Sequence, residues 1–226
     1  MHNGWYQLAY ESDLEEGLNC FQIGDKQLLV IVQGDGVRAC DAYCPHRGAH
    51  LGAGGVIKGD CILCPFHHYA IQIGGDSPLS VAEYETLLVG GLLFVRVQGG
   101  RDCGLTTELI ELEKTQYFVP GFLLEIRANA ELVIENAFDS RHFRPVHQIL
   151  NEPTFNPVET QRGEITFQGQ FELPPSAWQK SGTNASLVVP FKTTAYSPTV
   201  VISELGGDHP YRMLTSTVPQ PGGCFI

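Results

Sequence analysis

Basic residues are scarce in this sequence. Its 226 residues include 14 Lys and Arg against 25 Asp and Glu, which gives a formal net charge of −11. Proteins that bind nucleic acids present a basic face, so this balance argues against a nucleic-acid partner. The acidic balance is compatible with a basic redox partner, although most acidic proteins simply owe their solubility to such a charge.

Long apolar runs and targeting signals are also lacking. No apolar run reaches the roughly 20 residues that a membrane-spanning helix needs. Residues 1–17 have neither the basic start nor the apolar core of a secretory signal. The seven cysteines are odd in number and do not suggest a disulfide scaffold. We therefore expect a cytoplasmic protein without a membrane span, because a reducing compartment suits such cysteines.

Two short motifs with metal-ligand spacing stand out. Cys44-Pro45-His46 is followed, after the 17 residues 47–63, by Cys64-Pro65-Phe66-His67. Two thiolates and two imidazoles suit a metal that accepts soft and borderline ligands. The four side chains could hold one zinc ion tetrahedrally. They could also hold a [2Fe–2S] cluster of the Rieske type, with both Cys on one iron and both His on the other.

The residues around these motifs favour the cluster. Pro45 and Pro65 stiffen the two loops, and five glycines allow tight turns beside them. Backbone that approaches closely offers N–H donors to bridging sulfides, which a zinc ion would not need. CPHRGAHLG and CPFHHY resemble the two cluster-binding boxes of Rieske proteins, with a structural zinc knuckle as the alternative. The five glycines are Gly48, Gly52, Gly54, Gly55 and Gly59.

The resemblance also indicates a subtype. Respiratory Rieske proteins carry an extra Cys in each box and join the boxes by a disulfide, whereas the equivalent positions here are Ala49 and Phe66. This difference implies the low-potential group of Rieske ferredoxins and Rieske oxygenases. We expect the neighbouring polar residues and cysteines to serve packing or loop contacts rather than ligation, with His68 also able to touch a partner. These neighbours are Cys40, Arg47, His50, Cys61 and His68.

The pattern of short strands and turns predicts an α+β protein. Residues 1–100 read as an antiparallel all-β unit with Gly-rich turns, which ends near Gly99-Gly100. Residues 101–130 then connect to a second unit, in which 131–150 is the best helix candidate beside an antiparallel sheet. The strands expected in the first unit cover 5–12, 18–33, 37–43, 71–73 and 87–98. Those expected in the second cover 164–172, 186–196, 199–205 and 211–218.

A second candidate site lies within the expected helix. His142, His147 and Asp139 are the residue types of the 2-His-1-carboxylate site of non-haem Fe(II) oxygenases. Positions five apart point about 140° apart on a regular helix, so the two imidazoles could share a metal only if the helix were broken between them. Pro145 could cause such a break or mark a helix end. Alone, this spacing is also typical of two unrelated histidines on a helix.

Together with the upstream boxes, this motif resembles the α-subunit of Rieske non-haem iron oxygenases. ENAFDSRHFRPVHQ fits the family pattern N-x-x-D-x-x-H-x-x-x-x-H, which implies roles for Asn136 and Asp139 and metal binding by His142 and His147. The resemblance implies a Rieske domain in 1–100 and a helix-grip catalytic domain in 101–226. It also implies a [2Fe–2S] cluster, a mononuclear Fe(II) and electrons from a ferredoxin or an NAD(P)H-dependent reductase.

The residues of the two boxes resemble most closely those of the branch that includes ketosteroid hydroxylase and cholesterol desaturase. This resemblance implies a small but bulky apolar substrate, which would be oxidised with O2. His68-Tyr69 departs from the Gly-Trp usual after the second box. Family members assemble head to tail as rings, typically homotrimers, and the acidic residue at the position of Asp139 bridges two metal sites across that interface. Trp178, in the loop 171–180, could line the substrate entrance or be ordinary apolar surface.

The family's third iron ligand is an Asp or Glu on a late helix, beyond the strand that resembles 214–218. Asp208 and Glu204 are the late acidic candidates, and we expect neither to be the ligand. The sequence therefore predicts a catalytic domain that lacks the last family helices. Two other functions stay open: an electron carrier with a vestigial iron site, and a protein that binds an apolar ligand without chemistry.

Overall fold

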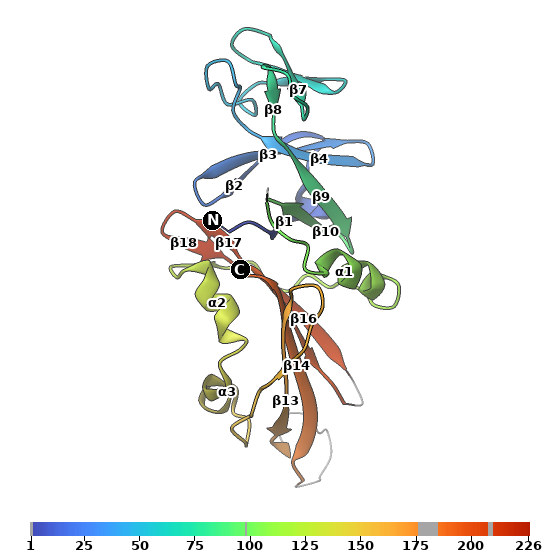
Figure 1. The fold of residues 1–226 in the computed structure, drawn as a ribbon, viewed down its shortest axis with the longest axis vertical. Helices are drawn as coiled ribbons and strands as arrows, with labels where there is room; N and C mark the ends of the chain where they lie inside the picture. The colour runs from blue at the N-terminus through green and yellow to red at the C-terminus, as the bar shows by residue number, and fades with distance from the viewer. Residues whose placement is uncertain (1, 98, 176–184, 208–209) are drawn as a thin grey trace.

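The structure is a computed structural model that describes residues 2–97, 99–175, 185–207 and 210–226. The molecule is elongated, with a small sheet at one end, a larger sheet in the middle and a third sheet with two helices at the other end (Figure 1). This arrangement confirms the predicted α+β class. No helix in the described part of the chain has the length and apolar character needed to cross a bilayer.

The middle sheet belongs to the N-terminal half. Its six antiparallel strands have the order β1-β10-β9-β4-β3-β2, so the first strand closes the sheet beside the last strand of this half. Strand β3 is buried along most of its length because it lies between β2 and β4. Its side chains point alternately into two apolar cores on opposite faces of the sheet. The strands are β1 (Trp5–Tyr10), β2 (Gly17–Ile23), β3 (Lys26–Gln33), β4 (Gly36–Asp41), β9 (Glu83–Val89) and β10 (Leu92–Arg96), and the 3-10 helix η1 (Glu11–Asp13) follows β1.

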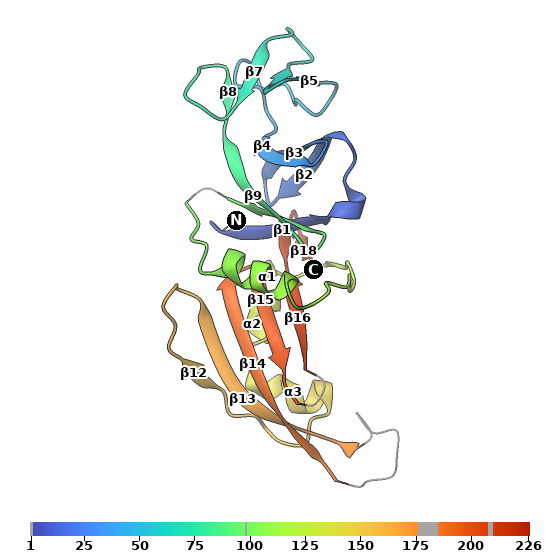
Figure 2. The same cartoon turned by 90° about the vertical axis from the view of Figure 1, so that its right-hand side faces the viewer.

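The small sheet is an insertion between β4 and β9. It holds four short strands in the order β5-β6-β7-β8, and Figures 1 and 2 show it at the end of the molecule remote from the helices. Both predicted metal-binding boxes are loops of this insertion, one before β5 and one between β6 and β7. The strands are β5 (Val56–Lys58), β6 (Cys61–Leu63), β7 (Ala70–Ile73) and β8 (Ser80–Val81).

The C-terminal sheet is antiparallel and has the order β12-β13-β14-β15-β16. Residues alternate between its faces, so Phe171 and Phe191 point toward helix α3 while Tyr196 and Ile202 point toward helix α1. Figure 2 shows the strands running away from the middle sheet. The strands are β12 (Asn156–Val158), β13 (Ile165–Leu173), β14 (Leu187–Ser197), β15 (Val200–Leu205) and β16 (Tyr211–Ser216).

Helix α1 (Leu105–Glu113) fills the junction between the middle and C-terminal sheets. Its residues Leu105 and Leu109 are buried against Trp5 of β1 and Val200 of β15. Burying a Leu side chain contributes about 1.5–3 kcal/mol, so this cluster is a large part of what holds the two halves together.

A fourth, three-stranded sheet joins the segment before α2 to the last two strands of the chain. It has the order β11-β18-β17, formed by β11 (Glu125–Ile126), β17 (Val218–Gln220) and β18 (Gly223–Phe225). The Gly24 N–H donates to the Pro219 carbonyl at 2.7 Å, which attaches β17 to the β2–β3 turn. The C-terminal segment therefore packs on the N-terminal half.

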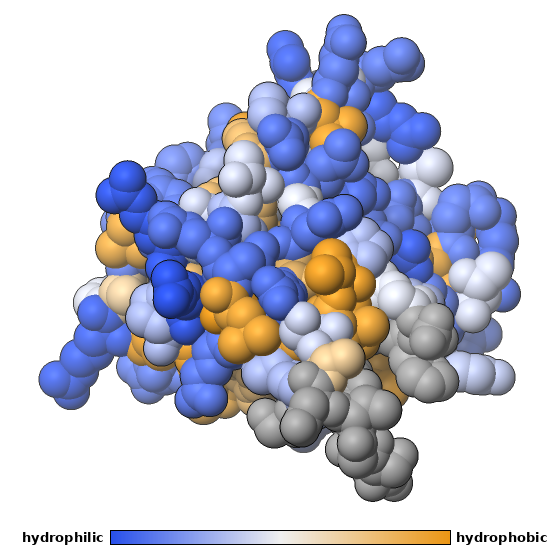
Figure 3. Space-filling view, turned by 90° about the horizontal axis from the view of Figure 1, so that it is seen from below, coloured by the Kyte–Doolittle hydropathy of each residue, from blue (hydrophilic) through white to orange (hydrophobic). Residues whose placement is uncertain are grey.

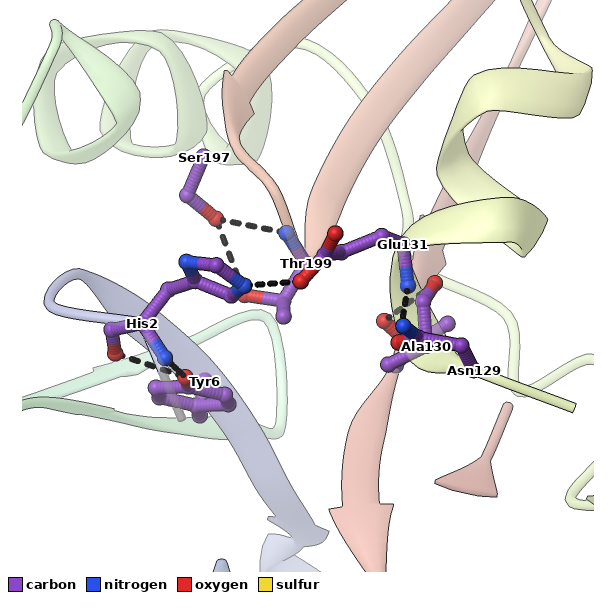
Figure 4. A network of polar contacts seen from close by, with 8 residues as sticks. His2, Tyr6, Asn129, Ala130, Glu131, Ser197 and Thr199 are labelled. Carbon is purple, nitrogen blue, oxygen red and sulfur yellow. Dashed lines mark hydrogen bonds and ion pairs between the residues drawn. The ribbon is translucent and has the colours of Figure 1, made fainter. Parts of the chain in front are cut away.

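Polar contacts complete this junction (Figure 4). The hydroxyl of Thr199 donates to the carbonyl of Trp5 at 3.0 Å, and the indole N–H of Trp5 donates to Asp102 at 2.8 Å. His2 hydrogen-bonds to Glu131 in the first turn of helix α2 (Ala130–Asn136). These contacts position α2, which leads into the second candidate site.

Most predicted strands are present, but the helices differ from the prediction. The stretch 101–130, expected to be a connection, contains α1. The single helix expected at 131–150 is wrong, since the chain forms α2 and then α3 (Ser140–His147). The break lies at Ala137 to Asp139, because Asp139 adopts an extended conformation and caps α3 with its carboxylate.

Candidate metal centres

The two boxes form loops with the same backbone geometry. The Cys44 N–H donates to the Ala49 carbonyl at 2.8 Å, and the Cys64 N–H donates to the Tyr69 carbonyl at 2.9 Å, five residues on in both cases. The carbonyl of each Cys also accepts an N–H from the residue four positions later, Gly48 in the first loop and His68 in the second. The sequence therefore builds two matching loops that face one another.

The matching positions Gly48 and His68 both have left-handed backbone, with φ of 70° and 56°. Glycine adopts this conformation freely, whereas a residue with a Cβ is strained in it. The second loop therefore carries a strained residue where the first carries glycine. This is the position at which the sequence departs from the Gly of related boxes.

The predicted cluster ligands divide into a buried pair and an exposed pair. Cys44 and Cys64 are buried, whereas His46 and His67 are exposed, with ring centroids 4.9 Å apart. A buried pair of Cys and an exposed pair of His fit a Rieske cluster, because two thiolates hold its inner iron and two imidazoles hold its outer iron. Among the described residues, no group of three or more His, Cys, Asp and Glu side chains forms a site for a single metal ion.

The environment of Cys64 suits a thiolate. Burial raises the pKa of the Cys64 thiol, but hydrogen bonds from the backbone N–H groups of Phe66 and His67 and a contact with Cys44 lower it further, so the net pKa is below its usual value. Backbone donors to sulfur are the kind of contact that stabilises an iron–sulfur centre. The four residues therefore fit a [2Fe–2S] cluster, and their assignment as its ligands stays a prediction.

Side chains of the apolar core pack closely against the two box loops. A Cβ on Gly52 would come within 2.5 Å of Cys20 Sγ and 2.8 Å of Leu29, so a larger residue at this position would displace these side chains. Cys40 lies in the core beneath the loops, and burial raises its pKa to about 12. A neutral thiol in that core agrees with the expected packing role of Cys40.

Aromatic rings surround the exposed imidazoles. The ring of Tyr69 lies 5.0 Å from that of His46 and 5.8 Å from that of His67, and Phe66 lies 6.2 Å from His67. In the sequence, Tyr69 stands out only as a departure from a family pattern. Its position directly after the second box was the available signal for a contact with both imidazoles.

The second candidate site lies on α3, at the far end of the molecule from the boxes (Figure 1). The rings of His142 and His147 have centroids 5.1 Å apart. Both residues belong to α3, which has Pro145 inside it and ends two residues later, so of the two possible effects of Pro145 the helix end is the one observed. His147 is the last residue of α3, and that position at the helix end allows its ring to approach His142.

Local contacts leave the outer nitrogen of His142 available for a metal. Its Nδ1 lies 2.6 Å from the main-chain carbonyl oxygen of Asp139, which only accepts, so Nδ1 carries the proton. Its Nε2 then presents a lone pair, and the side-chain amide of Asn136 lies 3.5 Å away. The carboxylate of Asp139 accepts the Arg141 N–H at 3.0 Å. It is therefore the main-chain carbonyl of Asp139, and not its carboxylate, that contacts the His142 ring.

Phenylalanines pack beneath the two histidines. Phe143 contacts the rings of His142 and His147 and packs on Phe171 and Phe191 of the sheet. Burial, and next the neighbouring His142, lower the pKa of His147 below its usual value, which favours the neutral form that binds metals. Figure 3 views this end of the molecule and shows apolar surface beside the hydrophilic patches.

The late acidic residue Glu204 does not join these histidines. The carboxylate of Glu204 is bound by Lys192 at 2.6 Å and by Arg212 at 2.7 Å. Its neighbour Leu205 packs in the phenylalanine cluster under α3, so Glu204 points to the opposite face of the sheet. This agrees with the expectation that Glu204 is not the third ligand. Asp208 and Trp178 lie outside the described residues.

Comparisons with known proteins agree with this picture. Residues 4–82 match the Rieske [2Fe-2S] domain family. The chain is 43% identical over 162 residues to cholesterol 7-desaturase nvd of Bombyx mori, covering 64% of this chain and 35% of the relative. It is 30% identical over 170 residues to the oxygenase component of 3-ketosteroid-9-alpha-monooxygenase of Rhodococcus rhodochrous, covering 64% and 41%. The chain thus spans less than half the length of these curated relatives.

Solved structures extend the likeness to the whole chain. Dicamba monooxygenase with non-heme iron and dicamba is 17% identical, with a TM-score of 0.65, over 99% of this chain and 74% of that one. A quaternary ammonium Rieske monooxygenase has a TM-score of 0.59 over 99% of this chain. Residues 4–82 therefore belong to the Rieske [2Fe–2S] domain family, and the chain as a whole has the fold of the Rieske oxygenases.

Proposed function

We propose that the chain acts in the oxygenase component of a Rieske non-haem iron oxygenase. The observation that carries this proposal is the pair His142 and His147, 5.1 Å apart, on a chain that also carries a Rieske domain. An electron carrier would need only the domain with the boxes. The chain instead continues into a sheet and helices that place two imidazoles edge to face, with 73° between their ring planes.

We assign the residues to two centres on two domains. In residues 1–100, Cys44, Cys64, His46 and His67 would hold a [2Fe–2S] cluster. In residues 101–226, His142 and His147 would hold a mononuclear Fe(II). When bound, the cluster supplies single electrons and the mononuclear iron supplies a site for O2 activation.

The chain's own residues orient and shield the second centre. The carbonyl of Asp139 fixes the tautomer and the plane of the His142 ring. The amide of Asn136 lies on the Nε2 side of that ring, where it can donate a hydrogen bond to a bound group. Phe143 and its neighbours close the sheet side to water. The carboxylate ligand common to such sites is not among the assigned residues.

An apolar organic molecule is the substrate class that this site fits best. The phenylalanine cluster under α3 offers apolar contacts, and the relatives named above carry cholesterol and 3-ketosteroid in their names. Hydroxylation, demethylation and desaturation are all reactions of this class of oxygenase. We propose a bulky, mostly apolar substrate for this chain.

The partners follow from the same function. We propose that a ferredoxin or an NAD(P)H-dependent reductase supplies electrons in the cytoplasm. The boxes and α3 lie at opposite ends of the molecule (Figure 1), so electrons would pass between chains in a head-to-tail homotrimer. In that ring the carboxylate of Asp139 would accept an N–H from a cluster-ligating histidine of the next chain, while the main-chain carbonyl of Asp139 keeps its contact with His142.

Metal and sulfide analysis tests the proposal. An anaerobically purified protein should hold about three Fe and two sulfides per chain, two Fe in the cluster and one in the mononuclear site. Two Fe per chain, with a normal cluster and no oxygenase activity, would favour an electron carrier or a protein that binds apolar ligands. EPR of the reduced protein, with nitric oxide added as a probe of mononuclear Fe(II), distinguishes the two kinds of iron.

A further inference from the structure

A cavity lies at the junction between the two halves of the chain, and we call it the junction cavity. Leu8 and Phe21 line it from the middle sheet, and Met213, Val218 and Phe225 line it from the C-terminal half. Its volume of about 520 Å³ falls within the roughly 300–1,000 Å³ of pockets that hold small molecules. The junction cavity shares no residue with the phenylalanine cluster under α3, so it is a separate place for an organic ligand.

An apolar loop, residues 117–124, contributes one wall of the junction cavity. The loop joins α1 to β11, and its residues Phe122 and Leu123 line the cavity although they are 62% and 67% exposed. Large apolar side chains that gather at one exposed place are typical of binding sites. The exposed side of this loop therefore gives the cavity an apolar entrance.

Backbone hydrogen bonds fix both ends of the apolar loop. Before its start, the Gln116 N–H donates to the Leu112 carbonyl of α1 at 2.8 Å. At its end, Leu124 and Ile226 exchange two N–H to carbonyl bonds of 3.0 and 2.9 Å. Phe118 anchors the loop between these points, because it packs in the apolar cluster around α1. The wall is thus formed before a ligand binds, which lowers the entropic cost of binding.

Neutral amides and hydroxyls supply most of the polar lining of the junction cavity. The Ser216 hydroxyl donates to Oε1 of Gln7 at 2.8 Å, and the side-chain amide of Gln220 donates to the Gln22 carbonyl at 2.9 Å. Both contacts join the N-terminal half to the C-terminal half. A hydroxyl or a side-chain amide can donate as well as accept, so this lining can also hydrogen-bond a hydroxyl or a carbonyl of a ligand.

The charge of the lining selects against anionic ligands. Asp13, an exposed residue of η1, carries the only charged side chain among the described residues that line the junction cavity. A carboxylate or phosphate in the cavity would lose its water without gaining a cation, which is costly. The lining therefore fits a neutral molecule better than a fatty acid of the same length.

We infer that the junction cavity binds a neutral amphipathic small molecule, which has an apolar body and one hydroxyl or carbonyl group. This site goes beyond the proposed oxygenase function and depends on neither metal centre. The ligand would contact β1 and β2 together with β16 and β17, so its binding stabilises the arrangement of the two halves.

A second copy of the chain is the competing occupant, because it could also cover the exposed side of the apolar loop. A stable interface between proteins buries about 1,200–2,000 Å² in total, which is more than a loop of this length provides. The hydrogen-bonding groups within the cavity also favour a small molecule that can enter it.

Two probes of equal chain length test the inference. The purified full chain is titrated by calorimetry with 1-decanol and, separately, with decanoate, both below the concentrations at which they aggregate. We expect 1-decanol to bind at one site per chain and about tenfold more tightly than decanoate, because the carboxylate would lose its water without a partner. Bound 1-decanol should also raise the temperature of unfolding.

Variants then locate the site. Leu123→Glu should weaken 1-decanol binding about tenfold, because it places a charge at the entrance. Leu132→Glu, a matched change at a 57% exposed leucine of α2 outside the junction cavity, should change the affinity less than about twofold. If Leu123→Glu disturbs the apolar loop, Met213→Glu tests the opposite wall at a position that is also exposed.

Three results would overturn the inference. They are decanoate binding as tight as that of 1-decanol, equal 1-decanol affinities of Leu123→Glu and Leu132→Glu, and a change in Leu123→Glu that is confined to the oligomeric state measured by light scattering. Iron analysis of the same samples reports the metal centres separately. A sample without mononuclear iron would refute the proposed function, while its titrations would still decide whether the junction cavity binds the alcohol.

Discussion

The imidazole of His142 is oriented by the main-chain carbonyl of Asp139, with 2.6 Å between Nδ1 and the oxygen. The contact exists because Asp139 is the N-cap of α3 and its carbonyl lies within reach of the side chain three residues later. The same residue thus begins the helix with its side chain and fixes a candidate metal ligand with its backbone. Substitutions of the Asp139 side chain should therefore leave the His142 ring in place.

Loss of either histidine on α3 should remove only the mononuclear iron. His142→Ala or His147→Ala should lower the iron content by about one Fe per chain and abolish oxygenase activity, because two imidazoles form the core of such a site. The visible spectrum of the cluster should stay the same, since its ligands lie on another domain. His50→Ala, which removes a histidine beside the boxes, serves as a control that should keep the mononuclear iron. A bleached cluster in His147→Ala would contradict the assignment of two separate centres.

Loss of a box ligand should have the complementary effect. Cys44→Ser or His67→Ala should abolish the EPR signal of the reduced cluster, which has a low average g value because two neutral imidazoles replace thiolates on one iron. Cys61→Ser is a matched control, because Cys61 lies in β6 near the second box but outside the ligand set. A colourless wild-type protein with one zinc per chain would show that the zinc alternative is the right one.

Local patterns predicted much of this fold. The strands of the N-terminal half follow from alternating residues between glycine turns, and the β segment expected at 87–98 contains the turn at Gly90 and Gly91 that joins β9 to β10. The two boxes form tight loops, as their Pro and Gly residues predicted, and the role of their Cys and His side chains as ligands stays a prediction. The C-terminal strands were also near their predicted bounds.

Contacts between distant segments explain what the patterns missed. The segment that forms helix α1 was expected to be a connection. The leucines on the apolar side of α1 are buried only by packing against Trp5 and Val200, which are distant in the sequence. The split between α2 and α3 depends on Asp139 acting as a cap, which competes with a continuous helix at the same residues. The approach of His147 to His142 likewise depends on its position at a helix end, which spacing alone does not reveal.

His68→Gly should stabilise the protein. His68 has a φ of 56°, where a side chain costs about 1 kcal/mol and glycine costs little, so we expect a gain of about 0.5–1 kcal/mol in the free energy of unfolding. Gly48→Ala, at the matching position of the first loop with a φ of 70°, should lose a similar amount. Denaturant unfolding of cluster-loaded protein measures both. Equal stability of His68→Gly and wild type would mean that the His68 side chain makes compensating contacts.

Asp139→Asn should separate the capping role of this residue from its proposed bridging role. Asparagine caps helices about as well as aspartate, so the variant should unfold at nearly the same denaturant concentration as wild type, whereas Asp139→Ala should lose about 1 kcal/mol. The backbone contact with His142 persists in Asp139→Asn, so both metal centres should stay loaded and the cluster should stay reducible.

Electron transfer is the property that Asp139→Asn should lose. If the carboxylate accepts an N–H from a cluster-ligating histidine across an interface while the Asp139 carbonyl holds His142, a neutral amide makes only a weaker, uncharged contact with that cluster-ligating histidine. Single-turnover oxidation of the reduced cluster by O2 and substrate should then slow by about two orders of magnitude or more. Stopped-flow absorbance measures this rate, with Glu135→Gln on α2 as a matched control that removes a nearby exposed carboxylate. A normal rate in Asp139→Asn, or full activity of a strictly monomeric protein, would show that Asp139 acts only as a helix cap.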